Sequence, residues 1–157
     1  FFLRISEEER LERNLAASHP QVSFMTEEIQ DLQWPASVDR VVMTTVFHDL
    51  YVPRIVGENY DAVGPVLNGI FDALRPGGQV LIIDHAAPDG AGAQFAADLH
   101  RIEEAHVEAL FTDAGFSLVG KMDFLRSRKD DYSVSVFNKK IRGRTDRFIH
   151  LYEKPTD

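Results

Sequence analysis

The hydrophobic pattern of the chain alternates between the spacing of strands and the spacing of helices. Short apolar runs predict strands at 38–46, 80–83, 116–124 and 148–152. Apolar residues at helical spacing predict helices over 59–74 and 99–114. Because strands that alternate with helices form right-handed βαβ units, we expect an α/β fold with a mostly parallel sheet. The last two strands are joined without a clear helix, so the C-terminal strand is predicted to be antiparallel.

The length of 157 residues is that of one domain, and we expect residues 1–157 to form it. A capping box near the start predicts a helix that ends at His19-Pro20, and 22–24 alternates like a short strand. Residues 125–146 form a long connection between the last two strands. A connection of this length in a compact domain is more often functional than idle.

Polar residues follow two neighbouring strands of the predicted sheet. Strand 38–46 is followed by Phe47, His48 and Asp49, and strand 80–83 runs directly into Asp84 and His85. Ligands of open α/β sheets bind outside the carboxyl ends of the strands. We therefore expect His48 and His85 to face a shared cleft.

The segment Leu74-Arg75-Pro76-Gly77-Gly78, which links a helix to the strand ending at Asp84, closely resembles the "LkPGG" segment of class I S-adenosylmethionine-dependent methyltransferases. The resemblance extends from about Glu9 to Pro155. It implies a Rossmann-like three-layer sandwich, S-adenosylmethionine as cofactor and methyl transfer to a small-molecule acceptor. The combination of His85, the 90–92 loop, 99–101 and 142–146 further resembles a subgroup of bacterial predicted methyltransferases.

The same resemblance assigns cofactor-binding positions. Glu28 and Ile29 take the places of the acidic and apolar residues that hold adenine in the family, with Glu28 replacing the usual Asp. Thr44, Thr45 and Val46 would lie beside the methionine moiety. The family's glycine-rich loop and its ribose-binding acidic residue have no counterpart and would precede Phe1, which is not a Met. We therefore expect an N-terminally incomplete fold: part of a longer protein, or one completed by a second copy in a homo-oligomer or by a partner.

Methyl transfer requires that a base remove a proton from the acceptor, and histidine is the natural base near neutral pH. The candidate catalytic residues are His48 with Asp49, and His85. The alternative for His48 is a strand-end histidine bonded to a loop carbonyl, and the alternative for His85 is a structural cap on the following loop. Candidate substrate residues are Phe47, Tyr51, Asp84, His100 and Arg101. The aromatic residues are equally consistent with a core position, and a solvated helix end is favoured for Arg101.

Composition narrows the partners and the alternatives. A net charge of −8 argues against broad binding to nucleic acid or membrane, although Arg142, Arg144 and Arg147 form a local basic group. His48, Asp49, His85 and His100 could gather around a metal ion, but no metal-binding spacing supports this and no cysteine is present, so no metal is expected. No apolar run approaches a membrane span and no signal peptide is visible, so we expect a cytoplasmic protein. A non-catalytic methyltransferase-like subunit is the main alternative; a nicotinamide-dependent oxidoreductase is less favoured because no Tyr-x-x-x-Lys pair occurs.

Overall fold

The computed structural model describes residues 14, 17–23, 33–58 and 61–156, which fall into two compact units. In the first unit, Phe1–Leu32, the described residues 14, 17 and 18 are helical, as predicted for the segment before His19-Pro20. Val22 and Ser23 do not form the predicted strand, because the Val22 amide donates to the carbonyl of His19 in a turn (2.9 Å). Phe24 lies outside the described residues.

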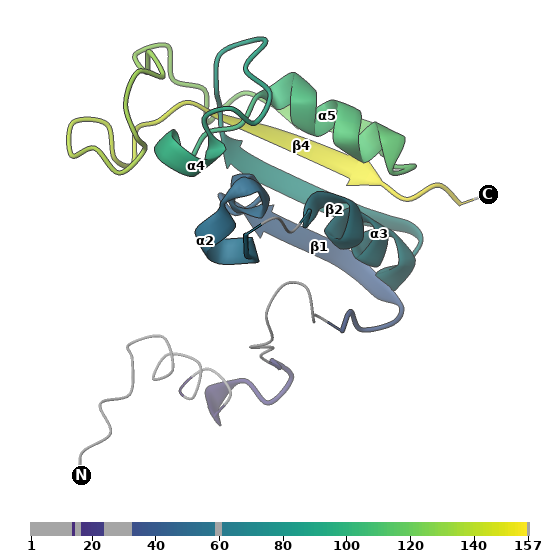
Figure 1. Ribbon diagram of the computed structural model, residues 1–157. Coiled ribbons are helices and arrows are strands. Elements are labelled where there is room, and N and C mark those ends of the chain that lie inside the picture. Colours follow the sequence, from purple (N-terminus) through teal and green to yellow (C-terminus); the bar gives the residue numbers. More distant parts are fainter. Residues whose placement is uncertain (1–13, 15–16, 24–32, 59–60, 157) are drawn as a thin grey trace. The chain divides into compact units, whose positions relative to one another are not determined.

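The second unit, Gln33–Asp157, contains a sheet with helices packed against it (Figure 1). Its described elements are, in chain order, β1 (Val38–Thr44), η2 (His48–Tyr51), α2 (Pro53–Val56), α3 (Val63–Ala73), β2 (Leu74–His85), α4 (Ala96–Leu99), α5 (Glu104–Asp113), β3 (Ser117–Met122) and β4 (Arg147–Glu153).

The sheet has the strand order β1-β2-β4-β3. β1 pairs with β2 in parallel, whereas β4 is antiparallel to both β2 and β3. Three of the four strands therefore run in one direction, and only the C-terminal strand opposes them. This arrangement confirms the predicted α/β class, the mostly parallel sheet and the antiparallel C-terminal strand.

Helices α3 and α5 pack on the same face of the sheet (Figure 1). Val80 on β2 pairs with Tyr152 on β4, and the Tyr152 ring stacks on Phe111 of α5 with centroids 4.2 Å apart. Val80, Phe111 and Tyr152 are all fully buried. Because side chains alternate along a strand, the neighbouring Leu81 points to the other face, where it is only half-buried. The hydrophobic core of the described residues thus lies between one face of the sheet and its helices.

The helix predicted over 99–114 is shorter than expected, since α5 begins only at Glu104. His100 adopts a left-handed conformation (φ 56°), and Ile102 then forms a parallel bridge to Ala86, just beyond β2. The Ile102 amide donates to His85 O and the Ala87 amide to Ile102 O, both at 3.0 Å. The backbone of Ile102 therefore bonds to the residues at and after the end of β2, and not to a first helical turn as expected.

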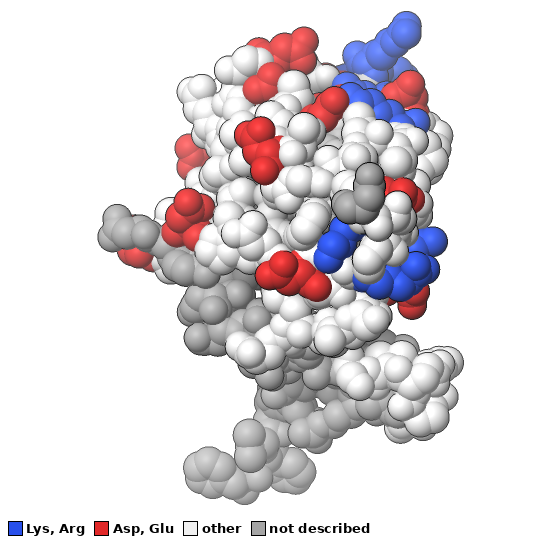
Figure 2. All heavy atoms as spheres, turned by 90° about the vertical axis from the view of Figure 1, so that its right-hand side faces the viewer, with Lys and Arg blue, Asp and Glu red and all other residues white. Residues whose placement is uncertain are grey.

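Basic side chains are distributed over one face of the protein less evenly than acidic ones (Figure 2). On the face shown in Figure 2, acidic side chains are spread over the surface, whereas basic side chains gather along one side. None of the helices in the described ranges has the length and apolar character that crossing a membrane requires.

Candidate functional site

A cavity of about 250 Å³ lies at the carboxyl ends of β1 and β2. Both strands end at this edge because they are parallel neighbours, and the segments that follow them carry polar side chains toward it. The cavity is lined by Thr45, His48, Asp49, Arg54, Ile55, His85, His100, Val136 and Phe137. Five residues predicted from sequence, Thr45, His48, Asp49, His85 and His100, thus surround one space, although they come from three separate parts of the chain.

Asp84, the last residue but one of β2, does not line the cavity but organises it from behind. Its fully buried carboxylate accepts hydrogen bonds from the ring Nδ1 of His48 (2.7 Å) and from the backbone amides of His48 (2.9 Å) and His85 (2.7 Å). The carboxylate fixes the ring orientation of His48, as the carboxylate of a catalytic triad does for its histidine. Burial opposes the charged imidazolium, but the hydrogen bond and negative charge of Asp84, with the charge of Asp49, raise the pKa of His48 above its usual value.

A second histidine continues the chain of hydrogen bonds that begins at Asp84. His100 Nδ1 lies 3.0 Å from His48 Nε2, and Arg54 Nη2 lies 3.1 Å from His100 Nε2. Since Arg54 can only donate, one consistent arrangement has neutral His100 donating from Nδ1 to His48 Nε2. Burial and the charge of His48 lower the pKa of His100. The charge of Asp49 opposes this shift, and the charge of Arg54 reinforces it. The two ring nitrogens of His48 are therefore both engaged.

His85 stands apart from this chain on the same cavity. Its Nδ1 lies 2.8 Å from the hydroxyl of Thr145, whereas its Nε2 makes no hydrogen bond to a described residue. Burial lowers the pKa of His85 to about 4; the nearby Asp84 opposes this shift, and the positive charges of His48, Arg101 and Arg147 reinforce it. The ring is thus neutral at pH 7, and in the tautomer that donates from Nδ1 to the Thr145 hydroxyl it presents the lone pair of Nε2.

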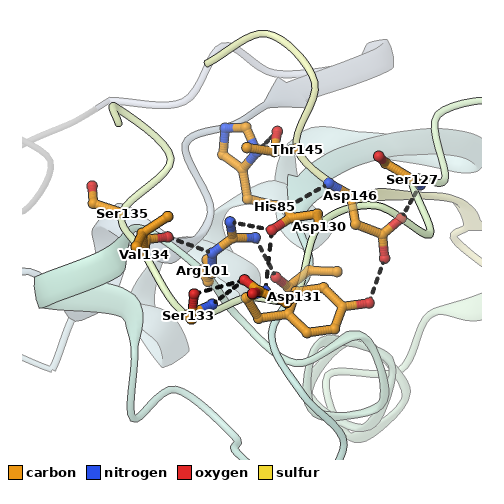
Figure 3. Close-up of polar contacts among 12 residues, drawn as sticks. His85, Arg101, Ser127, Asp130, Asp131, Ser133, Val134, Ser135, Thr145 and Asp146 are labelled. Carbon is orange, nitrogen blue, oxygen red and sulfur yellow. Dashed lines mark hydrogen bonds and ion pairs between the residues drawn. The ribbon is translucent and has the colours of Figure 1, made fainter. Parts of the chain in front are cut away.

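Arg101 corrects two expectations from the sequence. It neither lines the cavity nor lies at a solvated helix end, since its side chain is fully buried. Nη2 pairs with the buried carboxylate of Asp130 (2.9 Å), Nη1 donates to Ala86 O (3.1 Å) and Nε donates to Val134 O (3.3 Å), as Figure 3 shows for Asp130 and Val134. Arg101 therefore ties the 123–146 segment, which contains no helix or strand, to the end of β2.

The carboxylates of Asp130 and Asp146 hold the rest of that segment (Figure 3). The second oxygen of Asp130 accepts the amide of Asp146 (2.8 Å), and Asp146 in turn accepts the amide of Ser127 (2.5 Å) and the hydroxyl of Tyr132 (2.8 Å). Val136 and Phe137 lie in this irregular segment and line the cavity, and the amide of Val136 adds a bond to Leu99 O (3.2 Å).

Two predicted substrate residues lie elsewhere. Phe47 is fully buried against Phe111 (centroids 5.5 Å apart) and belongs to the core, the alternative noted for it from sequence. The Tyr51 hydroxyl lies 2.8 Å from His106 Nε2, and its side chain lines a different cavity of about 450 Å³ beside α3 and α5. Neither residue is among those lining the His48 cavity, so the substrate contacts predicted for them are not supported.

The predicted cofactor positions are only partly visible. Thr45 lines the cavity, has a left-handed conformation (φ 55°) and donates its amide to Ile83 O (2.6 Å). Thr44 and Val46 are exposed beside it. Glu28 and Ile29 lie outside the described residues.

A separate cavity of about 410 Å³ has a strongly basic lining that the Arg142–Arg147 pattern only partly indicated. Its cationic residues are Arg126, Lys129, Lys140, Arg144 and Arg147. Thr145 also lines it and connects it, through the hydrogen bond to His85, with the edge of the sheet.

Comparison with solved structures identifies the fold. A TehB-like SAM-dependent methyltransferase from Corynebacterium glutamicum is similar, with a TM-score of 0.57, 14% identity and coverage of 92% of this chain and 63% of the other. The Burkholderia thailandensis 1,6-didemethyltoxoflavin-N1-methyltransferase, solved with bound 1,6-didemethyltoxoflavin and S-adenosylhomocysteine, gives a TM-score of 0.58, 21% identity and coverage of 91% and 56%. The [4+2]-cyclase SpnF gives a TM-score of 0.60, 12% identity and coverage of 92% and 61%.

The fold of the chain is therefore that of class I SAM-dependent methyltransferases, as its sequence resemblance implied. The chain spans less than two thirds of the length of each of these three proteins. Neither a protein-family model nor a curated protein matches the sequence.

Proposed function

We propose that this chain belongs to an S-adenosylmethionine-dependent methyltransferase that acts on a small molecule. The observation that supports it most is the cavity at the carboxyl ends of β1 and β2, where Thr45, His48 and His85 lie together. In an open α/β sheet this edge is where ligands bind. The similar structures include methyltransferases, one of them with a small-molecule substrate bound.

The described residues fit one end of the cofactor. The cavity is smaller than the ~300–1,000 Å³ of typical ligand pockets, so it has room for the reacting end of a ligand and not for a whole nucleoside. Thr45 at this cavity, with Thr44 and Val46 beside it, is positioned for the methionine end. The adenine site proposed at Glu28 and Ile29 lies outside the described residues.

His85 is the residue to which we assign proton removal, in preference to His48. When bound, S-adenosylmethionine supplies a methyl group activated by the positive charge on its sulfur. His85 is neutral and its Nε2 is not bonded to a described residue, whereas both ring nitrogens of His48 are engaged. A base with a low pKa suffices because the proton of the acceptor becomes acidic as that atom acquires its new bond. Thr145 fixes the ring by its contact with Nδ1.

Two measurements test the proposal: the affinity for the cofactor and the rate of methyl transfer. In the complete protein that contains this chain, calorimetry is expected to show that S-adenosylhomocysteine binds and that Glu28→Ala weakens the binding. With a radiolabelled methyl donor and the small-molecule fraction of a cell extract, His85→Gln should reduce labelling about 10²–10⁴-fold while leaving cofactor affinity unchanged. His106→Gln, at Tyr51 and outside the cavity, is the matched control. Absence of cofactor binding would refute the proposed function, and full labelling by His85→Gln would refute the base.

A function without methyl transfer is the second candidate, because the similar fold of SpnF is that of a [4+2]-cyclase. Binding of S-adenosylhomocysteine with no methyl transfer to any acceptor would favour this alternative or the non-catalytic subunit. The homo-oligomer and the cytoplasmic location stay predictions, which sedimentation velocity and cell fractionation test.

A further inference from the structure

Three potential metal ligands converge at the mouth of the His48 cavity. His48 Nε2 lies 3.0 Å from His100 Nδ1, and Asp49 Oδ1 lies 3.3 Å from the first and 3.5 Å from the second. These side chains form the one group of metal-ligating type found among the described residues. We propose that His48, Asp49 and His100 bind a divalent transition-metal cation.

The triangle formed by the three atoms has the size of one face of a coordination sphere. A point at its centre is about 1.9 Å from each atom, so an ion displaced about 0.9 Å from the plane makes three bonds of about 2.1 Å. Bonds from zinc to imidazole nitrogen and carboxylate oxygen are about 2.0–2.2 Å. The side chains therefore need almost no movement to bind such an ion.

The carboxylate of Asp49 supplies an independent observation. Its Oδ1 is buried and makes no hydrogen bond to any described residue, although it faces two imidazole rings. A buried carboxylate oxygen without a donor is costly, and a cation bound between it and the two rings would remove that cost. The unsatisfied atom is one of the three proposed ligands.

Asp84 provides the outer support that metal-binding histidines usually have. Its carboxylate accepts a hydrogen bond from His48 Nδ1 at 2.7 Å, which leaves the lone pair on Nε2 and orients it toward the triangle. This carboxylate–histidine arrangement raises the basicity of the ligating nitrogen and fixes its ring. The contact to Asp84 is consequently suited to a metal site as well as to a base.

The positive charge of Arg54 opposes binding of a cation, so the proposal can also be tested by a substitution that should strengthen binding. Its Nη2 lies 3.1 Å from His100 Nε2, a contact that places the His100 hydrogen on Nδ1. Metal binding requires the lone pair on Nδ1, so the hydrogen moves to Nε2 and the exposed Arg54 side chain turns into solvent. Removing the guanidinium should therefore strengthen binding.

Two histidines and one carboxylate occupy one face of the ion and leave the other positions open, an arrangement typical of sites that also bind an exogenous ligand. All three residues line the cavity, as does His85, so an oxygen or nitrogen atom of a ligand there would complete the coordination. The metal site does not depend on methyl transfer. If both proposals hold, His48 is a ligand and His85 remains the base.

The test is a titration of tag-free, chelator-treated protein with Co²⁺, followed by its visible absorption and by displacement with Zn²⁺ in a calorimeter. We expect one ion per chain, at least tenfold weaker binding by Asp49→Asn and by His100→Gln, and tighter binding by Arg54→Met. Asp84→Asn should weaken binding about 10–100-fold. His106→Gln is the control and should bind as the unmodified chain does. Circular dichroism verifies that each variant is folded.

Binding that is absent, or that persists unchanged in both folded ligand variants Asp49→Asn and His100→Gln, would overturn the metal site. Because the titration uses no S-adenosylmethionine, its result is separate from that for the proposed function. Loss of cofactor binding with an intact Co²⁺ spectrum would refute the methyltransferase proposal alone. An intact cofactor site without Co²⁺ binding would refute the metal site alone.

Discussion

The buried ion pair between Arg101 and Asp130 gives the sharpest stability prediction. In Asp130→Asn the side chain keeps its shape but loses its charge, so the guanidinium is left buried without a counter-ion. Both side chains are fully buried, and removal of one partner from such a pair costs about 3–5 kcal/mol. For a chain of this length each kcal/mol lowers Tm by about 2–4 °C, so the expected loss in Tm is roughly 6–20 °C.

Urea unfolding followed by circular dichroism measures the effect. The matched control is Asp131→Asn, one residue away, because that carboxylate is exposed and Asn retains an oxygen to accept the Ser133 hydrogen bonds. The control should unfold at the same urea concentration as the unmodified chain. If Asp130→Asn and Asp131→Asn have the same midpoint, the ion pair does not stabilise the fold and the tie between the 123–146 segment and β2 is refuted.

Two further predictions concern a glycine and a carboxylate. Gly115→Ala should lower the free energy of unfolding by about 1–2 kcal/mol, because φ is 94° and the new Cβ lies 3.3 Å from the Phe71 ring. Gly64→Ala, in α3 with open space around it, should instead stabilise by about 0.5 kcal/mol; equal denaturation midpoints for the two variants would contradict this. The hydrogen bond from His150 lowers the pKa of Glu104 from its ordinary value of 4.5 to about 2; burial opposes this shift, and the charges of His150, Arg126 and Lys121 reinforce it. Its stabilisation is therefore complete above about pH 4.5 and is lost as pH falls toward 2, so the stability difference from Glu104→Gln should shrink over that range in urea titrations.

The parts of the fold that local patterns determine were predictable. The strands ending near Thr44 and His85 and the helix ending before Leu74 depend on periodicity and on turn residues close in sequence. Once β1 and β2 are parallel neighbours, the polar residues that follow them must meet at one edge. That is why a grouping of His48 and His85 followed from the sequence.

The parts that depend on distant contacts were not predictable. Helical spacing over 99–114 is real, but backbone bonds from Ile102 to β2 prevent the first turns from forming. Arg101 looked exposed because its partner, Asp130, lies 29 positions away, and the position of His100 beside His48 joins residues 52 apart. The proposed metal ligands were named from sequence but not favoured for the same reason, since only His48 and Asp49 are neighbours in sequence.

The anchored 123–146 segment has a consequence for how this protein could change its specificity. Phe137 lines the cavity, yet the bonds that hold its segment are made by other residues: by Asp130 and Asp146, and by the amide of Val136, which donates to Leu99 O (3.2 Å). Phe137 is exposed and rests its ring edge-on against His100. Mutations at Phe137 can therefore reshape the opening for new ligands at little cost to folding, whereas Val136 is buried and the anchoring aspartates keep the loop in place.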